Sequence, residues 1–100
     1  MFRATVQEEP GGFLMKLEGR MVGPWVAECE RAWLALESSL SAKKKLALDL
    51  CSVTFVDESG LELLRQIYGA TCACIVANSP LTKYFAERAM GSTTNGIKGA

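Results

Sequence analysis

Two short stretches near the start of the chain, residues 2–7 and 13–18, alternate apolar and polar positions. A period of two is typical of strands that bury one face. The segment between them, Glu-Glu-Pro-Gly-Gly, has the composition of a turn, so we expect an antiparallel hairpin. On its second strand Phe13, Met15 and Leu17 would share one face.

From Gly23-Pro24 onward the apolar residues are three or four positions apart, which is the period of an amphipathic helix. They are Trp25, Cys29, Trp33, Leu36 and Leu40. Proline suits the first helical position because its missing N–H is not needed there. Both tryptophans fall on the apolar side, so we assign them to the core and not to a ligand-stacking surface.

An apolar stretch over residues 45–50 predicts a central strand that is covered on both faces. Apolar residues continue through a bend to Val56, and helical spacing begins at Ser59. This second helix is expected to be short and to end near Gly69, at the next glycine.

Residues 72–77 are all apolar except for cysteine and predict another strand. Asn78-Ser79-Pro80 then predicts the start of a last helix, with Leu81, Tyr84 and Phe85 pointing inward. Residues 91–100 are rich in Gly, Ser, Thr and Asn, and we expect them to form a flexible tail.

The order strand, strand, helix, strand, helix, strand, helix predicts a single α/β domain over residues 1–90. Strand–helix–strand units with short connections require right-handed crossovers between parallel strands. We therefore expect a mostly parallel central sheet of about four strands, with one antiparallel edge strand and with helices packed against it.

Composition narrows the function classes. Among 100 residues, 11 basic residues balance 11 acidic ones, which argues against nucleic acid as a partner. No apolar stretch approaches the ~20 residues of a membrane span, and the N-terminus lacks a signal-peptide pattern, so we expect a cytoplasmic protein without membrane insertion. The chain has no histidine, and we assign its cysteines to the core instead of to a metal site or disulfide: Cys29, Cys51, Cys72 and Cys74.

The segment Asp57-Glu58-Ser59-Gly60 follows the predicted central strand, at the edge where open α/β sheets place their functional groups. Asp57 is a good N-cap, and Glu58 adds favourable negative charge to the first helical turn. Ser59 would present a hydroxyl at an exposed corner, and Gly60 would leave room for another chain to approach. The alternative interpretation is a well-capped helix start with no further role.

The residues around Ser59 do not favour catalysis. A serine nucleophile needs a base, and the chain has no histidine and no lysine in this turn. Asp57 does not look like a metal-assisted phosphoacceptor either, since the earlier strand end, Glu18-Gly19-Arg20, supplies one carboxylate and not a pair. We therefore expect no enzyme, cofactor or metal. A small enzyme or ligand-binding protein is the remaining alternative, which turnover abolished by Ser59→Ala would support.

Residues 49–61, Asp-Leu-Cys-Ser-Val-Thr-Phe-Val-Asp-Glu-Ser-Gly-Leu, resemble the signature of STAS domains, the family of anti-sigma-factor antagonists. Similar turns at residues 17–20 and 78–80 extend the resemblance over most of residues 13–88. The resemblance implies a STAS-like fold, with a second helix about one turn shorter than is usual in the family.

In that family the serine matching Ser59 is phosphorylated by a partner serine kinase that is also the anti-sigma factor, and the aspartate matching Asp57 supports it. The resemblance thus implies a regulatory module that binds a protein partner through Asp57, Glu58, Ser59, Gly60 and Leu61. A phosphate would add about −2 charge there and repel an acidic partner surface. Glu58 departs from the small or hydroxylated residue common at that position, and its fixed charge would either mimic part of the modified state or hinder a kinase.

STAS domains also serve as cytosolic subunits of phospholipid-transport ABC complexes, where they dock on the ATPase. This role is the alternative function that the resemblance implies. Co-purification with an ATPase, without an effect on transcription, would favour it. The resemblance specifies neither the individual partner nor the oligomeric state.

Overall fold

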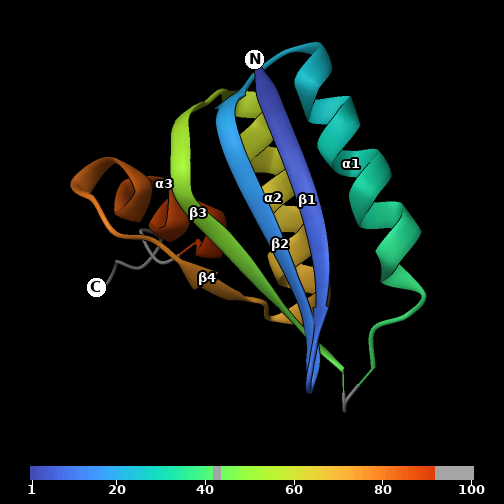
Figure 1. Cartoon of the computed structure of the whole chain (residues 1–100). Coiled ribbons are helices and arrows are strands. Elements are labelled where there is room, and N and C mark those ends of the chain that lie inside the picture. The colour runs from blue at the N-terminus through green and yellow to red at the C-terminus, as the bar shows by residue number, and fades with distance from the viewer. Residues whose placement is uncertain (42–43, 92–100) are drawn as a thin grey trace.

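The structure is a computed structural model that describes residues 1–41 and 44–91. Within them the chain forms a four-stranded sheet and three helices (Figure 1). The elements, in order, are β1 (Phe2–Glu9), β2 (Gly12–Met21), α1 (Pro24–Glu37), β3 (Lys45–Val56), α2 (Glu58–Thr71), β4 (Cys74–Val76) and α3 (Pro80–Met90). This is the order that the apolar pattern predicts.

The strands lie side by side in the order β1-β2-β3-β4. β1 is antiparallel to β2, whereas β2 and β4 are parallel to β3. In the middle of the sheet Leu48 pairs with Met15 on one side and with Ile75 on the other. The mostly parallel sheet with one antiparallel edge strand is therefore confirmed.

All three helices pack on one face of the sheet, and Figure 1 looks onto the other face, with α2 passing behind β1 and β2. Leu46, Leu48 and Leu50 of β3 point toward the helices and are buried. Residues between them, such as Asp49 and Cys51, are only half-buried. The prediction that β3 is covered on both faces is therefore wrong.

The second helix reaches Thr71 and is 14 residues long. It continues past the predicted end at Gly69, so it is less short relative to STAS domains than the sequence suggests. Its C-cap is Cys72, in the left-handed conformation at φ 53°. The fourth strand therefore starts only at Cys74. Residues 92–100, most of the predicted tail, lie outside the described residues.

Three predictions about burial are corrected. Trp33 is buried, but Trp25 is 39% exposed and covers the core only in part. Among the free cysteines Cys29 alone is buried, whereas Cys72 and Cys74 are exposed and Cys51 is half-buried. In α3 the prediction holds for Phe85 but not for two other large residues: Leu81 and Tyr84 are exposed.

Candidate functional site

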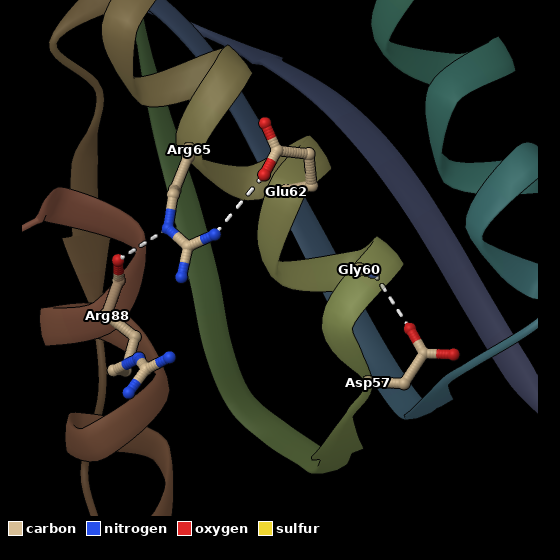
Figure 2. Close-up of polar contacts among 5 residues, drawn as sticks. All are labelled: Asp57, Gly60, Glu62, Arg65 and Arg88. Carbon is tan, nitrogen blue, oxygen red and sulfur yellow. Dashed lines mark hydrogen bonds and ion pairs between the residues drawn. The ribbon is translucent and has the colours of Figure 1, made fainter.

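Asp57 connects the end of β3 to the start of α2 and holds the turn together. One carboxylate oxygen, Oδ1, accepts a hydrogen bond from the Gly60 N–H at 2.8 Å, as an N-cap does (Figure 2). The other oxygen, Oδ2, accepts one from the Gly23 N–H at 3.0 Å. Because Gly23 is the N-cap of α1, one side chain fixes the starts of two helices.

These donors set the electrostatics of the turn. The hydrogen bond from the Gly23 N–H, followed by that from the Gly60 N–H, lowers the pKa of Asp57 below its ordinary value. Each bond favours the charged carboxylate. Asp57 is therefore ionised at neutral pH and places a fixed negative charge at the positive end of the α2 dipole.

Ser59 lies in the first turn of α2 and is exposed. Its hydroxyl donates a hydrogen bond to Asp57 Oδ1 at 2.8 Å, so the oxygen is held in one orientation and its lone pairs remain accessible. Glu58, beside it, is also exposed. The predicted combination of a helix cap, a carboxylate and an accessible hydroxyl is present.

The next two residues of the predicted site point into the molecule. A Cβ on Gly60 would lie 2.7 Å from Val56 Cγ1 and 2.8 Å from the Met21 carbonyl oxygen. The room that Gly60 leaves is thus filled by the ends of β2 and β3 and not by another chain. Leu61 is buried in the core as well, so the accessible part of the predicted site is Asp57, Glu58 and Ser59.

Arg65, further along α2, makes a contact that the sequence does not predict. Its Nε donates to the Arg88 carbonyl oxygen in the last turn of α3 at 3.2 Å, and its Nη1 lies 3.3 Å from Glu62 Oε1 (Figure 2). The i,i+3 spacing of Glu62 and Arg65 predicts their ion pair. No local pattern indicates the contact with α3, because it joins residues 23 positions apart.

The exposed turn offers a hydroxyl and charge but no metal cluster. Within the described residues no group of three or more Cys, Asp and Glu side chains is placed to hold a metal ion. A cavity of about 460 Å³ lies at the opposite end of β3, where Trp33, Lys45 and Leu46 contribute to its lining. None of the helices in the described part of the chain is both long and apolar enough to cross a membrane.

No family model matches the chain, and no curated protein matches it. Among solved structures, it is similar to the crystal structure of an anti-sigma factor antagonist from Mycobacterium paratuberculosis. The two have a TM-score of 0.77 and 20% sequence identity, over 94% of this chain and 82% of the other. The α/β fold expected from the STAS resemblance is thereby confirmed.

Proposed function

We propose that this protein is a non-catalytic regulatory module that binds a protein partner and is switched by phosphorylation of Ser59. The observation that carries the proposal is the exposed Ser59 hydroxyl, oriented by Asp57 at the start of α2. The fold shared with an anti-sigma factor antagonist supports it, as does the signature at residues 49–61. A partner serine kinase that doubles as the anti-sigma factor is the corresponding partner.

The turn is suited to accept a phosphoryl group from ATP bound by such a kinase. The bond from Ser59 Oγ to the γ-phosphorus forms as the bond from that phosphorus to the β,γ-bridging oxygen breaks, and ADP leaves. The hydroxyl proton passes to a base on the kinase, since the lowered pKa of Asp57 makes its carboxylate a weak base. Asp57 thus acts by orienting the hydroxyl.

The product would carry about −2 charge next to Asp57 and Glu58. The start of α2 tolerates this charge because its first N–H groups and the helix dipole favour anions. A partner that presents carboxylates to this edge would be repelled. Phosphorylation is therefore expected to release the partner without unfolding the domain.

The test is intact mass spectrometry of the protein purified from its own cells under several growth conditions, with peptide mapping across Ser59. We expect a species heavier by one phosphoryl group, with the modification on Ser59 and absent from Ser59→Ala. Ser52, which is exposed on β3, is the matched control: Ser52→Ala should be phosphorylated like the wild type. Phosphate that is absent under every condition, or that lies elsewhere, would contradict the proposal.

Glu58 favours a second candidate function. Its exposed carboxylate already supplies permanent charge beside Ser59, which suits a module that docks without a switch. Such a module would be the cytosolic STAS subunit on the ATPase of a phospholipid-transport ABC complex. Co-purification of the unmodified protein with an ATPase, unaffected by Ser59→Ala, would support this function over the first.

A further inference from the structure

Helix α3 buries Phe85 and three small side chains, and it leaves two other large apolar side chains outside. Its buried residues are Thr82, Phe85, Ala86 and Ala89. On the outer side Leu81 is 45% exposed and Tyr84 is 50% exposed, and their i,i+3 spacing places them on the same face of the helix. An exposed apolar surface of this kind on a small domain often marks an interaction site.

The apolar surface continues onto the sheet through a row of aromatic rings with an arginine at each end. The Arg20 guanidinium lies 5.8 Å from the centre of the Phe55 ring, and the Arg88 guanidinium lies 5.8 Å from that of Tyr84. Between them lies the Phe85 ring. Its centre is 6.0 Å from the centre of the Phe55 ring and 5.5 Å from that of the Tyr84 ring, and both pairs have edge-on geometry. We call these five residues, together with Leu81, the arginine–aromatic row.

The row begins at the edge of the sheet that carries Ser59. Arg20 pairs with Phe55 at the carboxyl ends of β2 and β3, and β3 leads into Asp57 and α2. Phe55 at the sheet end is 44% exposed and Tyr84 on α3 is 50% exposed, whereas Phe85 between them is buried and forms the floor of the row. A partner that covers Ser59 can therefore reach it.

The charges of the row identify the kind of partner. Within the described residues neither Arg20 nor Arg88 forms an ion pair, and each guanidinium lies over an aromatic ring, which leaves its N–H groups available to carboxylates. A second copy of this chain in a two-fold arrangement would bring arginines toward arginines. The chain's own residues 92–100 carry one lysine and no acidic residue, so they do not complement the row either.

We infer that the arginine–aromatic row is a docking surface for an acidic segment of a protein partner, one that inserts an apolar side chain between Phe55, Leu81 and Tyr84. Carboxylates on either side of that side chain pair with Arg20 and Arg88. The inference rests on the proposed function, since it describes the partner of the same edge. It also explains the switch, because an acidic partner held here is repelled by a phosphate on Ser59.

The experiment titrates the unphosphorylated, ¹⁵N-labelled full chain with two synthetic peptides and follows the backbone amide signals by NMR. One peptide carries a leucine and a tryptophan flanked by glutamates, and the other has every glutamate replaced by lysine. We expect the acidic peptide to shift the signals of Phe55, Leu81 and Tyr84, and the lysine peptide to shift none of them. Since the protein is unphosphorylated, the result does not depend on whether Ser59 is a kinase substrate.

Variants assign the binding to the row. Leu81→Ala and Tyr84→Ala should each lower the affinity for the acidic peptide by about tenfold, as truncation of a central apolar contact does. Leu34→Ala, which removes a leucine that is 56% exposed on α1, should leave the affinity unchanged. Arg20→Glu should lower the affinity for the acidic peptide and raise the affinity for the lysine peptide. The altered residues are exposed, and thermal melts check that each variant is folded.

Several outcomes would overturn the inference. They are equal binding of both peptides, signal shifts confined to another surface of the protein, and no saturable shift of the protein signals at acidic-peptide concentrations up to about 1 mM. Self-association abolished by Tyr84→Ala would assign the row to a second copy of this chain. Row signals that change on deletion of residues 92–100 would assign it to that segment. If phosphate is never found on Ser59 while the acidic peptide binds here, the switch fails and the docking surface stands.

Discussion

At the scale of single residues, Asp57 does most to determine the geometry of the site. Its carboxylate accepts hydrogen bonds from the N–H groups of Gly23 and Gly60 and from the Ser59 hydroxyl. The residue that orients the candidate phosphorylation site is thus also a structural cap. A loss of function in an Asp57 variant must therefore be separated from a loss of stability.

Asp57→Ala should lower the free energy of unfolding by about 1–2 kcal/mol, because it removes the N-cap of α2 and leaves the Gly23 N–H without its side-chain acceptor. Urea denaturation followed by circular dichroism measures the change. Asp57→Asn should cost less, since asparagine is also a good N-cap. Glu58→Gln removes the neighbouring charge from the same helical turn and is the control. It should lower the free energy of unfolding by much less than Asp57→Ala does. Equal effects of Asp57→Ala and Glu58→Gln would contradict the capping role.

The lowered pKa of Asp57 predicts a pH dependence of stability. Because the folded pKa lies below the unfolded one, the unfolded chain binds the proton more readily, and stability falls as the pH falls. The contribution is complete above the ordinary aspartate pKa of about 4 and is lost as the pH drops through the folded value. Urea denaturation at a series of pH values measures this dependence. Below about pH 4 the free energy of unfolding should fall less steeply with decreasing pH for Asp57→Asn than for the wild type. The same pH dependence in both proteins would show that Asp57 does not contribute to the loss of stability in acid.

At the scale of the elements, the approach of α2 to the strand ends depends on Gly60. Gly60→Ala should destabilise the protein by about 1–3 kcal/mol, since its Cβ would meet Val56 and the backbone of Met21. In the same helix a Cβ on Gly69 would extend into open space, so Gly69→Ala should stabilise by up to about 1 kcal/mol through helix propensity. The opposite signs, measured by thermal or urea unfolding, separate packing from propensity. A stabilising Gly60→Ala would contradict the close contact.

The type and order of the elements could be predicted because each carries a local signal. Pro24 and Pro80 mark the first helical positions, and Asp57 caps α2 as its residue type predicts. The burial of α3 could not be predicted in this way. Hydrophobicity favours Leu81 and Tyr84 as inward residues beside Phe85, whereas α3 packs through Phe85 together with the small side chains of Ala86 and Ala89. The buried positions 82, 85, 86 and 89 do have helical spacing, but Leu81 and Tyr84 lie on a competing, more hydrophobic face, and tertiary packing decides between the two faces.

At the scale of the whole molecule, the helices form one layer and the sheet another, with an open sheet face. The apolar run of β3 predicts cover on both sides, but the residues that point away from the helices include Asp49 and are half-buried. The position of the candidate site at the carboxyl edge of the sheet follows from the order of strands and helices alone. The inward direction of Gly60 and Leu61 does not, because it depends on how α2 lies against β2 and β3.

The two-layer arrangement predicts that cysteine reactivity reports on the folding of the whole domain. Cys29 is buried between α1 and the sheet, and burial raises the pKa of its thiol to about 12, so the reactive thiolate is scarce and enclosed. Cys72 and Cys74 are exposed and free. In the native state iodoacetamide should modify Cys72 and Cys74 readily and Cys29 only through unfolding, as peptide mapping by mass spectrometry would measure. Urea near the unfolding midpoint should accelerate labelling of Cys29 far more than that of Cys72, since only Cys29 requires the core to open. Rapid native labelling of Cys29 would show instead that α1 detaches from the sheet while the rest of the domain stays folded.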